Sequence, residues 1–177
     1  MILRLSQKLA QKVHEAPSQV LPMDANPFAD WSAHLFTADR TQYIIFSNTA
    51  SMYSAVLFGA GITYDGELVQ RGLGQIRETM EEDGLEFLYQ RFVAPASGTV
   101  QLSKALNRSV TGLTTDFVAM AKIWLCEGEL SPFEVAFKLN ENPMAPHRYA
   151  NPREVLKTLQ PLVELDSTKS SDESMTR

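Results

Sequence analysis

The chain has 177 residues, of which 44% are hydrophobic and 21% charged, a balance typical of a folded protein and not of a disordered one. This length fits one domain and leaves little room for two. Sixteen Lys and Arg side chains against 21 Asp and Glu give a net charge of −5. That balance argues against a protein whose task is non-specific clamping of DNA or RNA.

The single cysteine, Cys126, excludes an intramolecular disulfide and a cysteine-based zinc site. It falls in an apolar helical pattern, which predicts a buried packing role. The apolar start of the chain is interrupted by Arg4 and turns polar at Ser6, so it lacks the core of a secretory signal. The longest apolar run, 55–62, is far shorter than the ~20 residues of a membrane span. We therefore expect a cytoplasmic protein without membrane contacts.

The first 30 residues predict a strand, a helix and a loop. Residues 2–5 are apolar and short, as in a strand. Ser6 is a suitable N-cap for a helix ending near His14, because Leu9 and Val13 lie one turn apart. Residues 16–30 contain three prolines, which predicts an ordered loop across the surface.

The strongest strand signal lies in residues 33–58. Segments 33–37 and 42–47 are rich in β-forming residues and flank a polar turn at 38–41, and segment 51–58 has the same character. This pattern predicts a three-stranded antiparallel meander.

Two long helices are predicted further along. Residues 66–83 have one apolar face, with Asp65 as cap and Gly84 just past the end. The second helix is expected to begin at Thr114 or Thr115, with Asp116 in its first turn, and to stop at Gly128.

Between the two helices the signals are shorter. Residues 86–93 fit a short helix or a strand. Residues 98–104 alternate like a strand, and 108–111 are a candidate for its hairpin partner across 105–107.

The C-terminal part predicts two short capped helices and a tail. Ser131-Pro132-Phe133-Glu134 is a capping box that opens a helix to about Leu139, and Asn151-Pro152 opens another, over 155–159. Residues 164–177 have no apolar face and are expected to be disordered.

Together these elements predict a single α+β domain over residues 1–163. Its expected architecture is an antiparallel sheet of about five strands, with the meander at 33–58, packed against several helices. Apolar strand edges with Tyr53 and Phe58 could serve a homodimer.

No motif specific for a known chemistry is present. The chain lacks the patterns GxxxxGK[ST], HExxH and GxSxG, and has no GxGxxG after a strand. Its three histidines share no ligand spacing, so neither a metal site nor a cofactor is predicted.

Two segments, 34–48 and 104–116, place polar residues where packing alone does not require them. The candidate ligand-binding residues are His34, Arg40, Asn48, Asn107, Arg108, Ser109 and Asp116. Arginine beside Asn, Ser or Thr at a strand end or turn can hold a phosphate or carboxylate, and Gly112 could add backbone donors. The sequence thus predicts an anion-accepting site near Arg40 and Arg108.

A purely structural interpretation stands beside this one. Asp39-Arg40 is common turn chemistry, and Asn107-Arg108-Ser109 can form another turn. Asp116 can simply cap a helix, and His34 is favoured as a hydrogen-bonded sheet residue.

The same blocks resemble a bacterial family of unknown function. The resemblance rests on Trp31 to Arg40, Tyr43-Ile44-Ile45-Phe46-Ser47-Asn48, Tyr53-Ser54 and Asn107-Arg108-Ser109-Val110-Thr111-Gly112, and it covers residues 1 to about 160. The chain departs from the family at Gly112-Leu113-Thr114-Thr115-Asp116, where the family tends to show Gly-Ser-Met-Asn-Asp. The resemblance supports a single domain and implies no activity, cofactor or catalytic residue.

Three functional hypotheses follow. The preferred one is a non-enzymatic binding protein for an anionic small molecule or a protein partner, because no nucleophile–base pair is visible. The second is a small hydrolase or transferase for a phosphorylated or nucleic-acid substrate, with His34 or Asp116 as acid or base. The third, a nucleic-acid-associated regulator, requires a local basic patch. Whether the chain is an enzyme stays open at this point.

Overall fold

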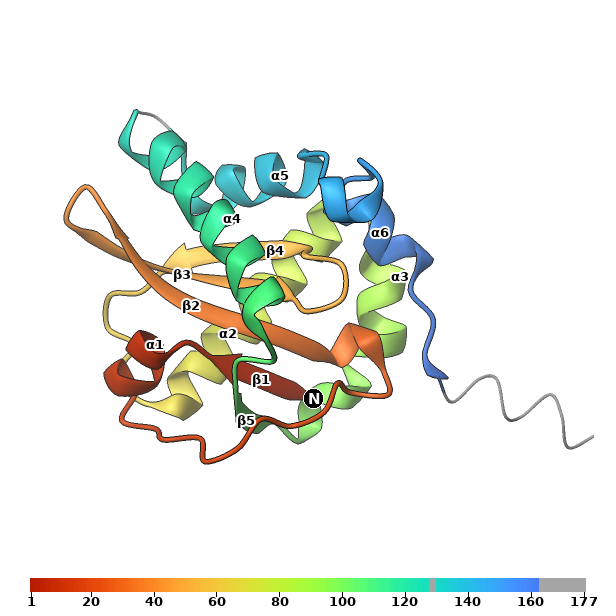
Figure 1. The fold of residues 1–177 in the computed structure, drawn as a ribbon, viewed down its shortest axis with the longest axis horizontal. Helices are drawn as coiled ribbons and strands as arrows, with labels where there is room; N and C mark the ends of the chain where they lie inside the picture. Colours follow the sequence, from red (N-terminus) through yellow and green to blue (C-terminus); the bar gives the residue numbers. More distant parts are fainter. Residues whose placement is uncertain (128–129, 163–177) are drawn as a thin grey trace, which may run out of the picture.

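The fold is built on one five-stranded sheet with strand order β4-β3-β2-β1-β5 (Figure 1). The computed structural model describes residues 1–127 and 130–162. The strands are β1 (Ile2–Leu5), β2 (Asp30–Ala38), β3 (Thr41–Asn48), β4 (Ser54–Phe58) and β5 (Gln101–Lys104). The α+β class is therefore confirmed.

Strands β2, β3 and β4 form the antiparallel meander that the sequence predicts. Ala38 pairs with Thr41, so the β2–β3 turn has two residues, Asp39 and Arg40, with φ angles of 41° and 63°. Left-handed φ at both positions is typical of a type I′ turn, whose twist matches that of the flanking strands.

The sheet is mixed, so the expectation of a purely antiparallel sheet is wrong. Strand β1 pairs in parallel with β2 on one side and with β5 on the other. A parallel pair needs a long connection, and the helix and loop between β1 and β2 supply it. Two four-residue strands carry no sequence signal for the direction in which they pair.

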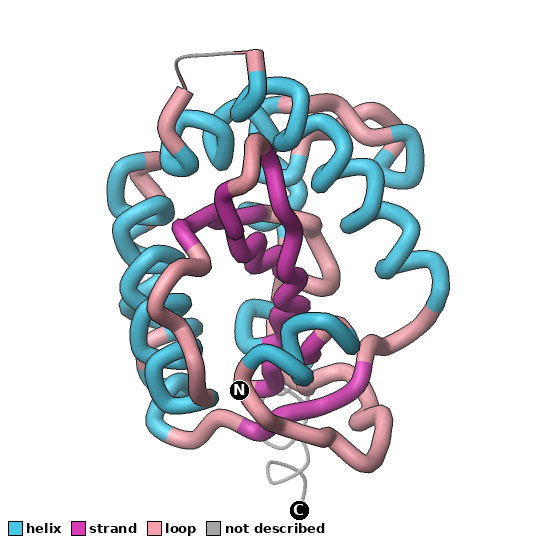
Figure 2. Tube along the Cα trace, turned by 90° about the vertical axis from the view of Figure 1, so that its left-hand side faces the viewer, coloured by secondary structure: helices cyan, strands magenta, loops and turns pink. Residues whose placement is uncertain are grey.

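Helices cover both faces of this sheet (Figure 2). They are α1 (Gln7–Lys12), α2 (Asp65–Glu82), α3 (Glu86–Leu88), α4 (Arg108–Cys126), α5 (Pro132–Glu141) and α6 (Pro152–Thr158). A π-helical turn, Tyr89–Val93, follows α3, so segment 86–93 is helical. Single 3-10 turns lie at Pro27–Ala29, Pro95–Gly98 and Ala145–His147.

Helices α1 and α2 pack on one face of the sheet. Alternate strand residues point to opposite faces, and those on this face are buried with Leu9 of α1 and Ile76 of α2. Helix α2 approaches closely because Gly72 lies against the ring of Phe46; a Cβ atom on Gly72 would be 2.4 Å from that ring. Tyr53, a predicted dimer contact, is fully buried, and its hydroxyl donates to Asp83 at 2.7 Å.

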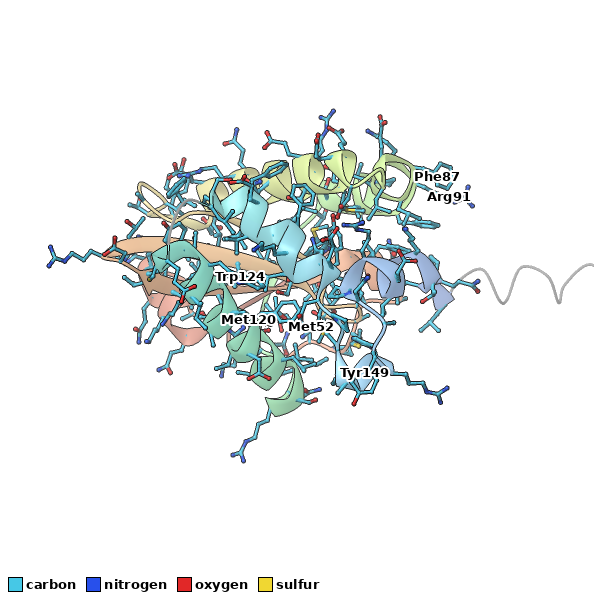
Figure 3. All side chains as sticks on the ribbon, turned by 90° about the horizontal axis from the view of Figure 1, so that it is seen from above. Met52, Phe87, Arg91, Met120, Trp124 and Tyr149 are labelled. Carbon is cyan, nitrogen blue, oxygen red and sulfur yellow. The ribbon has the colours of Figure 1, made fainter. Side chains whose placement is uncertain are left out.

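Helices α4 and α5 pack on the other face. Their buried residues include Phe117 and Leu139, which share a core with Phe36 and Ile45 of the sheet. Met120 and Trp124 follow one another along α4 at the margin of this core (Figure 3).

Helix α4 begins at Arg108, so the predicted strand at 108–111 and the predicted helix start at Thr114 or Thr115 are both wrong. Asn107 is the N-cap, and its side chain accepts from the Val110 N–H at 3.0 Å. β-branched residues favoured a strand here. In the structure the segment is helical, and three threonine hydroxyls of α4 are satisfied within it, because each donates to the carbonyl four residues earlier.

The other caps agree more closely with the sequence. Ser131 and Glu134 form the capping box of α5, and Asn151 caps α6. Asp65 is the first residue of α2 and not its cap. Gly84 has a φ of 72°, as a residue just past a helix end often requires.

Cys126 is exposed, so its predicted buried role is wrong. The buried stripe of α4 contains Phe117 and Ala121, and Cys126, five residues later, falls on another side of the helix. The predicted stop at Gly128 and the predicted tail at 164–177 lie outside the described residues. In the described part of the chain, no helix combines the length and apolar character needed to cross a membrane.

One charged pair, Arg4 and Asp30, is fully buried on the face opposite α2. Arg4 Nε and Nη2 donate to the two carboxylate oxygens, each at 2.7 Å. Its other N–H groups donate to the carbonyls of Leu21 and Pro22 and to Ser103 Oγ. The pair thus fastens the loop between α1 and β2 to β1 and β5.

Candidate functional site

A hollow of about 670 Å³ opens beyond the carboxyl ends of β1 and β5. We call it the β1–β5 crevice; the polar residues of its lining that matter here are Ser6, Gln11, Glu15, His34, Lys104 and Thr111. The two segments singled out in the sequence therefore meet in space, through His34 from the first and Lys104 and Thr111 from the second.

The topology of the chain explains why a crevice forms here. Strand β1 leads into α1, whose Leu9 and Val13 are buried on the α2 side of the sheet. Its parallel neighbour β5 leads into α4, whose Phe117 is buried on the opposite side. Helices that leave adjacent parallel strands toward opposite faces leave a gap between them, and open α/β sheets bind ligands at this place.

His34 lies at the inner wall of the crevice. The β1–β2 ladder ends at the pair Leu5–Ala33, so His34 is the first β2 residue past it. No described residue makes a hydrogen bond with its ring, contrary to the expectation of a hydrogen-bonded sheet histidine. Burial lowers the pKa of His34 from 6.5 to about 4. The ring is therefore neutral at pH 7 and offers one donor and one acceptor nitrogen.

Positive charge gathers on the β5–α4 side. Lys104 is exposed and forms no ion pair with a described residue. Arg108 is exposed in the first turn of α4, one turn before Thr111, so both lie on the same side of the helix. The amino end of this 19-residue helix adds the positive end of its dipole. Glu15 is the one acidic residue among those lining the crevice.

The lowered pKa of His34 predicts a pH-dependent stability. Between pH 6.5 and 4 the unfolded chain binds a proton at this residue that the folded chain does not. The free energy of unfolding should therefore fall by about 1–2 kcal/mol over that interval, since the ring keeps some solvent contact. In His34→Gln this part of the slope should be absent, as measured by urea unfolding at pH 7, 6, 5 and 4.5. Identical pH profiles for the two proteins would show that His34 is not shielded as the structure has it.

Arg40 lies apart from the crevice. It is exposed in the β2–β3 turn, which projects past the sheet and away from the start of α4 (Figure 1). It follows His34 by six residues, roughly 20 Å of extended strand. The structure does not bring Arg40 and Arg108 together around one small ligand.

Asn48 is buried, and its polar atoms are bonded within the protein. Its Nδ2 donates to the carbonyls of Pro27 and Asp30. Its Oδ1 accepts from the backbone N–H groups of Ala50 and Ser51 and from the Ser51 hydroxyl. Asn48 therefore shapes the β3–β4 connection and has no polar atom left for a ligand.

The other predicted residues belong to α4. Asn107 caps it, and Ser109 is exposed in its first turn. Asp116 is exposed further along and lines a different hollow, with Pro143 and Met144. An acid–base pair of His34 and Asp116 is therefore not assembled. Within residues 1–127 and 130–162, no three His, Cys, Asp or Glu side chains converge as metal ligands.

The sequence did not single out the α1 wall of the crevice, which contributes Ser6, Gln11 and Glu15. A signal was nevertheless present. Twice a short strand is followed within three residues by an N-cap residue, Ser6 directly after β1 and Asn107 three residues after the end of β5. That signal points to a shared site only when the two strands are known to be parallel neighbours.

Comparison with known proteins identifies the family of the chain but no characterised relative. Searches of curated proteins and of solved structures find nothing that matches. The family model described as "Domain of unknown function (DUF6933)" matches residues 2–155. That range contains all five strands and every residue of the crevice named above. It agrees with the resemblance in the sequence blocks, and the chain belongs to the DUF6933 family.

Proposed function

We propose that this protein binds a small molecule carrying an acidic group, and that the β1–β5 crevice holds it. The observation that carries the proposal is the position of the crevice. It lies outside the carboxyl ends of two parallel strands, between helices that leave to opposite faces of the sheet. A pocket of this volume suits a ligand of metabolite size.

The lining supports a ligand with two unlike ends. Leu5, Ala10 and Pro17 supply an apolar surface. Lys104, the register partner of Leu5 in the neighbouring strand, and the amino end of α4 favour a carboxylate, sulfonate or phosphate. The neutral ring of His34 adds one hydrogen bond and no charge.

Binding fits these residues better than hydrolysis does. The hydroxyl of Ser6 accepts from the Leu9 N–H as a helix cap, and that of Thr111 donates to the Asn107 carbonyl. Both hydroxyls thus hold helices in place, and neither is paired with His34 as a nucleophile would be.

The proposal predicts binding of an amphipathic anion, tested with 8-anilinonaphthalene-1-sulfonate. Its fluorescence should rise saturably with the wild-type protein. Lys104→Glu should weaken binding at least fivefold, because it replaces the attracting charge at the rim with a repelling one. His34→Trp, which fills the inner wall, should weaken it as well.

The matched control is Lys122→Glu, which makes the same charge change on an exposed α4 residue that does not line the crevice. It should leave the affinity for the dye within twofold of wild type. Equal weakening by Lys104→Glu and Lys122→Glu would show that the dye responds to net charge, and the proposed site would be wrong.

A further inference from the structure

A second hollow, of about 660 Å³, lies between α2 and α5 along the β4 edge of the sheet. We call it the α2–α5 groove. Phe58 of β4 lies on one side of it, the α2 residues from Glu67 to Glu78 on another, and Ser131 to Phe133 at the start of α5 on a third. It shares no lining residue with the β1–β5 crevice.

The length of the groove suits an extended chain. Its lining follows α2 from Tyr64, just before the helix, to Glu78. Fourteen residues at 1.5 Å each span about 20 Å. An extended segment covers that length with about six residues.

Three aromatic side chains from three elements surround the groove: Phe58, Tyr64 and Phe133. Phe58 and Tyr64 are 50% and 57% exposed. Two of the rings contact a neighbouring ring: Phe58 lies 5.3 Å from Tyr43 and Phe133 lies 4.8 Å from Phe137, measured between ring centroids. The other strongly exposed aromatic residues, Phe87 and Tyr149, stand singly at separate places (Figure 3).

Two residues of the β4 edge, Ser54 and Phe58, bond to side chains of the neighbouring helices. At Ser54, the Asn140 side chain bonds both the backbone N–H and the carbonyl, at 2.7 and 2.9 Å. Arg71 donates to the Phe58 carbonyl at 2.9 Å. Because the Gly59 N–H bonds to Gln42 of β3, the Phe58 N–H points away from the sheet, and no described residue accepts from it. An unpaired donor on a sheet edge can bind the backbone of an added segment.

The charge of the groove is negative. The Arg71 guanidinium is tied to the carbonyls of Phe58 and Ala60 and lies 3.9 Å from Glu67. Glu78, on the same side of α2, is exposed and forms no ion pair with a described residue. Residues 65–86 contain seven acidic side chains and two arginines. Carboxylates beside aromatic rings attract ammonium and guanidinium groups.

We propose that the α2–α5 groove binds an extended segment of a partner protein that carries lysine or arginine side chains. The basic groups lie beside Glu67 and Glu78 and over the aromatic rings. The backbone of the segment accepts from the Phe58 N–H.

The test uses fluorescence anisotropy with a labelled hexapeptide of alternating lysine and valine. It should bind the wild-type protein saturably, whereas the same peptide with glutamate in place of lysine should not bind. Glu78→Lys should weaken binding at least tenfold, and Phe133→Ala about fivefold. Circular dichroism should show unchanged folding, since the first substitution affects an exposed residue.

The matched control is Glu82→Lys, an exposed α2 residue outside the groove with the same change of charge. It should change the affinity by less than twofold. Equal weakening by Glu78→Lys and Glu82→Lys would overturn the proposal, because only the general acidity of α2 would then matter. Displacement of the peptide by equimolar butylamine would also overturn it, since a small cation would then be the ligand.

Discussion

Arg4→Met is expected to lower the free energy of unfolding by about 3–5 kcal/mol, the range for removing one partner of a buried ion pair. Both side chains of the Arg4–Asp30 pair are completely buried. All five N–H groups of Arg4 are bonded, two to Asp30 and three to Leu21, Pro22 and Ser103. Methionine retains much of the volume of the arginine and removes every one of these donors.

The expected loss of stability is large because the partners of Arg4 stay buried after the arginine is removed. The Asp30 carboxylate keeps its bonds from the Thr49 hydroxyl and the Asp24 N–H but loses its counter-charge. The carbonyls of Leu21 and Pro22 also lose their donor. The loop whose Pro17 and Val20 line the β1–β5 crevice should then loosen, so faster proteolytic cleavage near these residues is expected as well.

Urea unfolding provides the measurement, with Arg77→Met as the matched control. Arg77 forms its ion pair with Glu81 on the surface of α2, so the same substitution there should have little effect. The double variant Arg4→Met/Asp30→Asn should lose clearly less than the sum of the single variants, because no unpaired charge stays buried. An Arg4→Met protein as stable as the Arg77→Met protein would contradict the role of this pair.

What the sequence predicted well is local. The meander, the Ser6 and Ser131 caps and the glycine after α2 depend on residues a few positions apart. The wrong predictions share a cause. Where two local structures are about equally favourable, packing against distant parts of the chain decides between them. At α4, threonines with high strand propensity are helical because Asn107 caps the segment and Phe117 and Ala121 further along the helix pack against the distant sheet. Cys126 fits the apolar pattern of the sequence but lies outside the buried face of α4.

The candidate site was predicted in part for the same reason. The segments around His34 and Arg108 do meet, but Lys104, Thr111 and the α1 residues complete the crevice, while Arg40 lies elsewhere. Which residues line the crevice is decided by the parallel pairing of β1 with β5, and this pairing joins residues about 100 positions apart. Arg4 shows the same limit. In the sequence it is a charge that interrupts an apolar run, and only its distant partners make it a buried anchor.

Gly72→Ala and Gly74→Ala are expected to change stability in opposite directions, although both lie in α2. At Gly72 a Cβ atom would meet the Phe46 ring at 2.4 and 2.5 Å, and that ring is 1% exposed and cannot turn away. Overpacking of this kind costs about 1–3 kcal/mol. At Gly74 nothing lies within 4 Å of the added atom, so the better helix propensity of alanine should add about 0.5–1 kcal/mol.

Thermal and urea unfolding of the two variants measure the difference directly, and the double variant Gly72→Ala/Phe46→Leu tests its cause. Trimming the ring should restore part of the stability lost at Gly72, so the two substitutions should be less than additive. The gain in helix propensity is the same at both positions, whereas only Gly72 packs against the sheet. The comparison therefore separates the effect of propensity from the effect of packing. If both alanine variants were stabilised, propensity alone would govern, and α2 would not rest on Phe46 as closely as the structure requires.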